Sequence, residues 1–297
     1  MRVTTTQAQR ATLDNLQGNL QRLLKTQNQA ATGRRFERAS EDPAAAADIL
    51  RFDTRLSANG QYRRNLDSAI ARATSQDRVL GQIANLVDRA SELAVQQSTA
   101  SANAETRLTA QVEVEQLLES LVGLGNTRFG EGFLFGGTRA DQAPLANTPG
   151  ATPPYLTDPA PLGAPQLEIA EGILATPVHT AHEIFGDTNL MVRLRDLSAA
   201  LGANDVDGVR AAIGQLQEVQ TEIQALTGAT GARVNQFEAA RTELGEATLD
   251  ARVQRSAVAD IDIAEAVANF SQAQTAYQAA LSAASRVINL NITDYLR

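Results

Sequence analysis

The residues with the clearest potential for chemistry are two histidines, His179 and His182, which precede Glu183. Imidazole groups three residues apart can lie on one helical face and bind a metal ion such as zinc. A zinc site also needs a third ligand and supporting hydrogen bonds around the ligands, and the neighbouring sequence specifies neither. We therefore interpret the pair as a polar surface turn and expect no metal and no other cofactor.

The serines, glycines and cysteines show no catalytic pattern. No serine lies in a Gly-x-Ser-x-Gly turn, and the glycine-rich stretch 123–132 lacks the lysine of a phosphate-binding loop. Cysteine is absent, which excludes thiol catalysis, disulfides and cysteine metal sites. The sequence therefore predicts a protein that is not an enzyme.

Composition also limits the partners. The 297 residues carry a net charge of −8, and the basic side chains alternate with acidic ones instead of forming a patch. Binding to nucleic acid phosphates needs clustered cations, so no nucleic acid partner is expected. No stretch approaches 18 consecutive apolar residues, and the first residues contain no apolar core of a secretory signal peptide. We expect neither a membrane span nor an ordinary signal peptide.

Proline divides the chain. Eight of the nine prolines fall between Pro144 and Pro177, where the fixed φ angle and the missing N–H group disfavour helix. Short segments such as residues 166–170 can pair as strands there. On both sides of this insert, apolar residues recur at spacings of three and four, which is typical of helices that pack along one face. Such stripes occur at Leu66/Ile70/Ala73/Leu80/Val87/Ala94, Leu108/Val112/Leu118/Val122 and Val206/Val209/Ile213/Leu216/Ile223/Leu226.

The limits of the first helices are visible in the sequence. Gly33 follows the first stripe and predicts a helix end. Asp42 before Pro43 predicts an N-cap followed by proline at the first helical position. The expected fold is mainly α: an elongated antiparallel helical bundle or coiled coil built from both chain ends, with a small β- and turn-rich insert in the middle. The expected segments are an N-terminal assembly helix and turn (1–56), a helical rod (57–140), the insert (141–190), a second rod segment (191–254) and a C-terminal assembly helix (255–297).

The two terminal helices are predicted to need partners. Each has only four or five large apolar side chains over about thirty residues, which supply on the order of 10 kcal/mol when buried. Ordering about thirty residues costs several times more, and isolated helices are marginal in water. We expect these helices to pack on each other and on neighbouring copies. The predicted subunit-interface residues are Leu13, Leu16, Leu20, Leu23, Tyr277, Leu281, Ile288, Ile292 and Tyr295.

Both chain ends resemble bacterial flagellins. Residues 31–36 and 39–45 are similar to the signature near the start of that family, with Ala31-Thr32 in place of Ser-Ser and Glu41 in place of Asp. Residues 260–266 and 277–281 are similar to the closing helix of the family. Within it, residues 1–5, 133–137 and 292–297 most resemble the members that join hook to filament.

The resemblance implies a structural subunit of the bacterial flagellum that forms the junction layer between hook and filament. Implied partners are copies of itself in a ring-like layer, a neighbouring hook-associated protein and flagellin, and an export chaperone at the C-terminal helix. Implied localisation is extracellular, after secretion through the flagellar type III apparatus. Two alternatives stay open: a flagellin subunit of the filament itself, and a cytosolic coiled-coil signalling module.

Overall fold

The computed structural model describes residues 2–99, 102–146 and 163–295, with side chains described from residue 10 to residue 286 inside those ranges. The chain is mainly helical, as predicted, with long helices at both ends and short strands in the middle. Its contacts group into unit 1, residues 1–58 and 247–297, and unit 2, residues 59–246. The division into five segments stays a prediction. Within the described part of the chain, no helix is long and apolar enough to cross a membrane.

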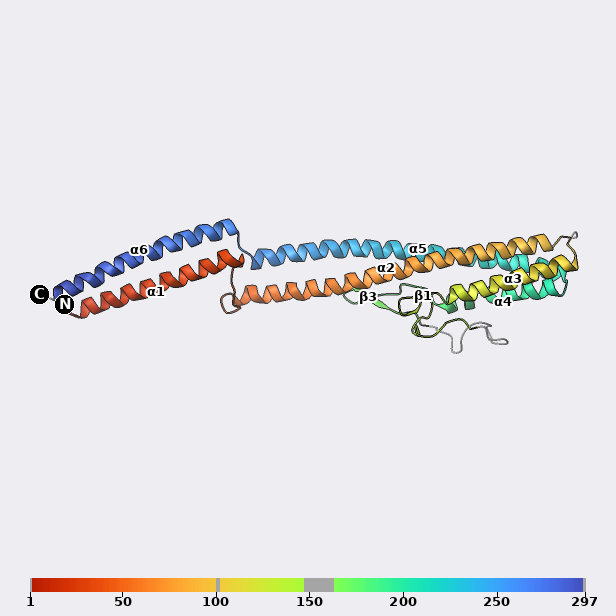
Figure 1. The fold of residues 1–297 in the computed structure, drawn as a ribbon, viewed down its shortest axis with the longest axis horizontal. Helices are drawn as coiled ribbons and strands as arrows, with labels where there is room; N and C mark the ends of the chain where they lie inside the picture. The colour runs from red at the N-terminus through yellow and green to blue at the C-terminus, as the bar shows by residue number, and fades with distance from the viewer. Residues whose placement is uncertain (1, 100–101, 147–162, 296–297) are drawn as a thin grey trace. The chain divides into compact units, whose positions relative to one another are not determined.

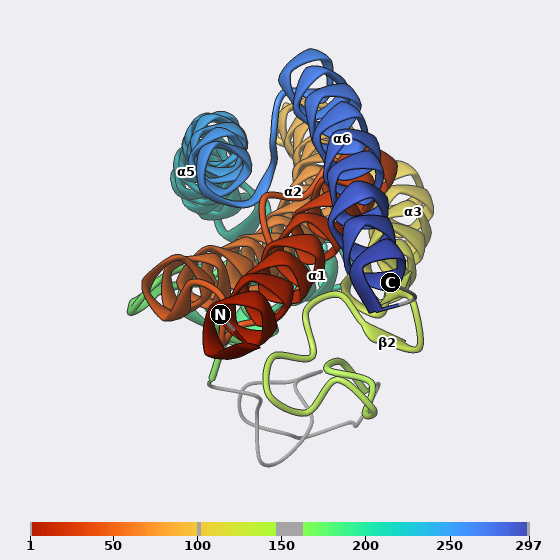
Figure 2. The same ribbon diagram turned by 90° about the vertical axis from the view of Figure 1, so that its left-hand side faces the viewer.

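Unit 1 is a helical hairpin with two attached helix ends. Helix α1 (Arg2–Thr32) packs against helix α6 (Ile263–Tyr295), and the two run antiparallel so that both chain termini lie at the same end of the unit (Figures 1 and 2). The beginning of α2 (Pro43–Gln97) and the end of α5 (Val206–Ala259) complete the unit. The two ends of the sequence are therefore brought together, as the sequence predicts.

The predicted helix limits in unit 1 are confirmed. Helix α1 ends at Thr32 because Gly33 takes a left-handed φ of 68°, which glycine adopts without steric cost. Helix α2 begins at Pro43, and the Asp42 Oδ1 atom accepts a hydrogen bond of 3.0 Å from the Ala45 amide. This bond satisfies an amide that has no partner within the helix, so Asp42 is the N-cap.

Unit 2 packs four helices around a main apolar core, and a second, smaller core lies between α2, α5 and the strand β3 (Leu167–Ala170). Helices α3 (Ala104–Gly125) and α4 (Leu190–Gly202) lie beside the remaining lengths of α2 and α5 (Figure 1). Between α3 and α4 the chain forms two antiparallel hairpins, β1 (Arg128–Phe129) with β2 (Gly132–Phe133) and β3 with β4 (Ile173–Ala175). A short π-helix, η1 (His182–Asp187), leads into α4. The predicted strand over residues 166–170 is thus confirmed.

The stripes predicted for the middle helices have mixed outcomes. On α2 and α5 the predicted residues are buried or half-buried, so these faces point into the core. On α3, Leu118 is buried, whereas Leu108 and Val112 are exposed. The prediction that these two residues face the core is wrong. Helix α3 turns Ala110, Val114 and Leu121 inward instead.

The segment Phe133–Gly137 joins the insert to the core. Strand β2 ends at Phe133, and the next two residues, Leu134 and Phe135, are fully buried. The Phe135 ring meets the Phe185 ring edge-on, with centroids 6.2 Å apart. A Cβ atom on Gly136 would lie 2.9 Å from the Ala140 Cα atom, so only glycine fits this turn. Strand β2 is only two residues long, so the buried pair and the glycine turn follow it directly.

Gly125, at the end of α3, leads to a stability prediction. A Cβ atom there would overlap the Leu145 Cδ1 atom and lie 3.0 Å from the Phe185 ring. Replacing Gly125 with alanine should lower the free energy of unfolding by about 1–3 kcal/mol because the core must shift. Replacing Gly123, whose Cβ would meet nothing within 4 Å, should raise it by roughly 0.5–1 kcal/mol. Urea unfolding followed by circular dichroism measures both, and equal shifts would contradict the packing argument.

Candidate assembly surface

The inner faces of α1 and α6 have the spacing of a coiled coil. Their less exposed residues recur at alternating intervals of four and three along each helix, which keeps one narrow face toward a partner. On α1 these residues are Thr12, Leu16, Asn19, Leu23, Thr26 and Ala30. On α6 they are Ala266, Phe270, Ala273, Tyr277, Ala280 and Ala284. We call these two rows the inner seam.

A second set of apolar residues on the same helices faces away from the inner seam. Leu13 and Leu24 of α1 keep 54% and 51% of their surface exposed, and Leu281 of α6 keeps 44%. We call the outer stripes the exposed apolar residues Leu13, Leu20 and Leu24 on α1 and Ile263, Val267 and Leu281 on α6. Each helix therefore presents apolar surface in two directions, and the hairpin covers only one of them.

The buried residues of unit 1 are small. Among its described residues, every buried apolar side chain is an alanine, namely Ala45, Ala251, Ala259, Ala266 and Ala284. Unit 2 instead buries large side chains such as Phe135, Phe185 and Phe237. Burial of a large apolar side chain stabilises a fold by about 1.5–3 kcal/mol, and unit 1 gains little of this by itself. Contiguous exposed apolar surface marks an interaction site.

The residues predicted for the subunit interface divide into three groups. Leu16, Leu23 and Tyr277 are half-buried and lie in the inner seam. Leu13, Leu20 and Leu281 belong to the outer stripes. Ile288, Ile292 and Tyr295 belong to α6, but their side chains lie outside the described residues. The structure therefore places the first two groups, predicted as one interface, on different faces of the helices.

Several exposed apolar residues of unit 1 were missed by sequence reasoning. Leu24, Ile263 and Val267 lie in the outer stripes, and Leu249 and Val253 lie one helical turn apart on α5 with about 60% of their surface exposed. A signal was present for Leu24: it follows Leu23 directly, and neighbouring helical residues point about 100° apart. Adjacent leucines cannot both lie in one narrow seam.

The turn after α1 is held by pairing with the segment before α6. The Arg35 amide donates to the Ala259 carbonyl oxygen and the Ile261 amide donates to the Gly33 carbonyl oxygen, both at 2.9 Å. Arg35 also bonds the Asp42 carboxylate at 2.7 Å. The Ala45 amide, aided by Arg35, lowers the pKa of Asp42 below its usual value. This pairing fixes how the chain leaves α1 and enters α6.

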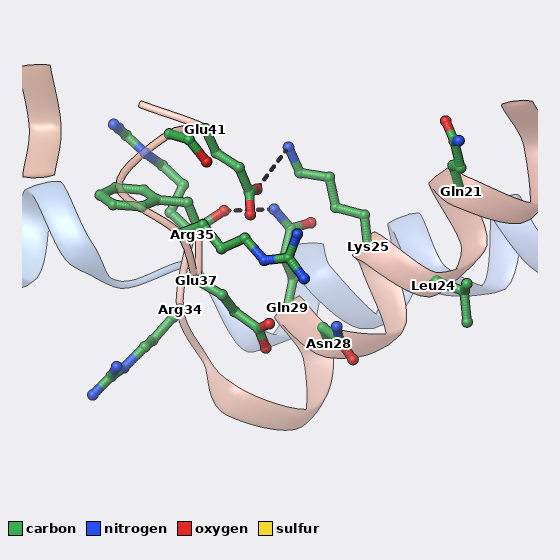
Figure 3. A pocket seen from close by; sticks show the side chains of 12 residues that line it. Gln21, Leu24, Lys25, Asn28, Gln29, Arg34, Arg35, Glu37 and Glu41 are labelled. Carbon is green, nitrogen blue, oxygen red and sulfur yellow. Dashed lines mark hydrogen bonds and ion pairs between the residues drawn. The ribbon is translucent and has the colours of Figure 1, made fainter. Parts of the chain in front are cut away.

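A polar hollow of about 540 Å³ lies beside this turn (Figure 3). The Lys25 ammonium and the Glu41 carboxylate point toward each other across it, 3.5 Å apart, and Gln29 Nε2 donates to the Arg35 carbonyl oxygen at 2.7 Å. Lys25 and Glu41 are exposed, and an exposed ion pair of this kind is typical of a solvated surface rather than a reaction site.

The described residues contain no cluster of three or more histidine, cysteine, aspartate or glutamate side chains that could hold a metal ion. The interpretation of the two histidines as a surface turn needs correction, however. His179 is buried, and its Nδ1 atom lies 2.7 Å from the Glu183 carboxylate, while His182 is more exposed and lies near Asp187. Contacts with α2, a hundred residues earlier in the chain, cover His179.

A helical hairpin made from the two chain ends, with apolar stripes facing outward, defines a self-assembling subunit. Residues 3–140 match the bacterial flagellin N-terminal helical region, and residues 204–296 match the bacterial flagellin C-terminal helical region. The chain belongs to the bacterial flagellin family, which supplies helical structural components of the flagellum.

Three relatives show which members of the family this chain resembles. It is 22% identical to flagellar hook-associated protein 3 of Escherichia coli over 295 residues, covering 91% of each chain. It is 21% identical to the flagellar filament 30.7 kDa core protein of Treponema maltophilum over 271 residues, covering 91% of this chain and 87% of that one. A solved structure of the flagellar junction protein FlgL from Legionella pneumophila aligns with a TM-score of 0.57 at 13% identity, covering 73% of this chain and all of that one. That likeness supports the fold.

Proposed function

We propose that this chain is the structural subunit that forms the junction layer between the hook and the filament of a bacterial flagellum. The observation that carries the proposal is the outward-facing apolar surface of unit 1, whose buried apolar residues are alanines alone among those described. Membership of the flagellin family and the similarity to hook-associated protein 3 support a place in the flagellum. They also argue against a cytosolic signalling module.

In this proposal the inner seam and the outer stripes have separate roles. The inner seam holds α1 and α6 together within one chain, through Leu16, Leu23 and Tyr277. The outer stripes pack on neighbouring copies in a ring-like layer, and on the hook-associated protein and the flagellin above and below it. Leu281 represents the outer stripe of α6. Ile288, Ile292 and Tyr295 extend the predicted interface toward the chain end.

Export and protection before assembly follow from the same features. We propose secretion of the unfolded chain through the flagellar type III apparatus, which the absence of cysteine favours because no disulfide can form beforehand. The exposed apolar stripe of α6 would need a cover inside the cell, and an export chaperone that binds the C-terminal helix would provide it. No catalytic role is proposed.

Immunogold labelling of intact flagella tests the proposal, with an antibody raised against the β3–β4 hairpin. A single band between hook and filament is the expected result. Labelling along the whole filament would instead identify a filament flagellin, the alternative that the similarity to a filament core protein keeps open. Intact flagella that bind a control antibody but not this one would overturn both assignments.

A further inference from the structure

A buried side chain of α2 bonds the segment through which the insert returns to the helices of unit 2. Gln76 of α2 is fully buried, and its amide group makes two hydrogen bonds with the backbone of His179. The Gln76 Oε1 atom accepts from the His179 amide at 2.9 Å, and Nε2 donates to the His179 carbonyl oxygen at 3.0 Å. A buried polar group must keep its partners, so these bonds define where the segment docks on α2.

The imidazole of His179 is satisfied on one side only. Its Nδ1 atom lies 2.7 Å from Glu183 Oε2, which also accepts from the Thr180 amide at 3.2 Å. Since a carboxylate only accepts, the neutral ring carries its proton on Nδ1 and leaves Nε2 as an acceptor. The Nε2 atom is buried and has no partner among the described residues. The surroundings of the ring therefore suit the neutral imidazole that carries its proton on Nδ1.

The positive charge of Arg233 on α5 acts on this ring. The Nη1 atom of Arg233 is likewise buried without a partner among the described residues. Burial, followed by the positive charge of Arg233, lowers the pKa of His179, and the nearby Glu183 offsets part of this. From α2, the neutral Gln76 bonds the backbone of His179. A second proton would thus create a buried cation that is repelled by the charge of Arg233 and has no acceptor for its Nε2–H group among the described residues.

The same short segment supplies several core residues. From 178 to 187, the buried apolar side chains are Val178, Ala181, Ile184 and Phe185. All four belong to the main core of unit 2, and the Phe185 ring packs edge-on against Phe135. Detachment of His179 from α2 would therefore pull apolar side chains out of the core as well.

We propose that His179, Gln76 and Arg233 form a proton-operated latch, which releases residues 178–187 from the helices of unit 2 when His179 gains a proton. Residues 178–187 are called the latch segment below. The latch lies in unit 2 and does not depend on the proposed junction function. Binding of a proton to His179 triggers the latch, and the result is local opening of the region that joins the insert to the helices.

The direction of the pH dependence follows from proton linkage. In the opened segment His179 is solvated and titrates near the ordinary histidine value of about 6.5, whereas its pKa is lower in the closed segment. Opening therefore binds a proton at pH values between these two pKa values. The closed segment is most stable above about pH 6.5. Below that pH the equilibrium constant for closing decreases by up to about tenfold per pH unit. Below the pKa of the closed state the dependence levels off.

Hydrogen exchange of the full-length protein, corrected for the intrinsic pH dependence of amide exchange, tests the latch. Between pH 7 and pH 5 the opening constant of the latch segment should rise at least threefold more than that of α3. The variant His179→Gln, whose amide can still donate to Glu183, should remove this excess. Arg233→Met should raise the pKa of His179 and reduce the excess. His182→Gln is the matched control and should leave it unchanged.

Proton NMR gives an independent measure, because the chain has only two histidines and His182→Gln assigns their signals. His179 should titrate below the ordinary histidine value, and Arg233→Met should move its titration upward. The proposal is overturned if His179 titrates at or above about 6.5. It is equally overturned if the latch segment opens to the same extent at pH 5 and pH 7, or if His179→Gln retains the full pH dependence. A chain that labels the junction normally could still fail these tests, so the two proposals fail separately.

Discussion

Replacement of Phe135 by alanine is expected to lower the free energy of unfolding by about 3–5 kcal/mol. The Phe135 ring is fully buried and packs edge-on against Phe185. The Phe135 carbonyl oxygen also accepts a hydrogen bond of 3.2 Å from the Ala181 amide, so the ring lies where two distant parts of unit 2 meet. Truncation would leave a cavity that this network of backbone contacts cannot close. Urea unfolding of the full-length chain, followed by circular dichroism, measures the loss.

The matched control for this prediction is Phe133→Ala, two residues earlier in the same segment. Phe133 is half-buried, and the Arg128 guanidinium lies over its ring at 5.2 Å. A cation–π contact at an exposed site contributes about 0.5–1 kcal/mol, so the control should lose little more than this together with some apolar burial. Similar losses in both variants would mean that Phe135 does not join the insert to the core as described.

Replacement of Leu281 by aspartate is expected to block attachment of the chain to flagellar hooks while leaving its own fold intact. Leu281 is exposed in the single chain, so a carboxylate there stays hydrated and should change the unfolding midpoint little. In an assembled layer the same carboxylate would be buried against apolar surface without a partner. A central interface residue is worth at least about 2 kcal/mol, which corresponds to a roughly thirtyfold weaker attachment. Co-sedimentation with isolated hooks measures this.

Ser282→Asp serves as the control for Leu281→Asp. Ser282 is an exposed neighbour on the same helix, and its hydroxyl donates to the Gln278 carbonyl oxygen. The substitution adds the same charge about 100° around the helix, outside the outer stripe. Normal attachment of Leu281→Asp would refute the assembly role of the outer stripe. Equal failure of both variants would point to the added charge rather than to the stripe.

The outer stripes and the inner seam show that the spacing of apolar residues predicts a helix but does not predict which of its faces is covered. Leu13, Leu16, Leu20 and Leu23 fit one heptad stripe, and so do the half-buried residues of the inner seam, which share only Leu16 and Leu23 with it. Both patterns have spacings of three and four, so both predict a helix with an apolar face. Which leucines turn inward depends on how α6 sits against α1, and that is a property of two segments more than two hundred residues apart.

The same reason explains the errors in unit 2. Leu108 and Val112 follow the helical spacing, but α2 and α4 pack on the other side of α3 and leave them exposed. His179 lies in a polar local sequence that predicts surface, yet it is buried, and Gln76 of the distant helix α2 bonds its backbone. Burial of a residue is decided by its neighbours in space, and a single sequence does not name them.

What the sequence by itself determined is the local part of the structure and the class of the protein. Glycine and proline set the limits of α1 and α2, and alanine-rich helices with few large apolar side chains indicated chain ends that need partners. These features act through the backbone of the residue itself or of its neighbours. Only the tertiary structure decided which apolar face is covered within the chain, which is left exposed, and that His179 is buried. Each of these depends on contacts between segments far apart in the sequence.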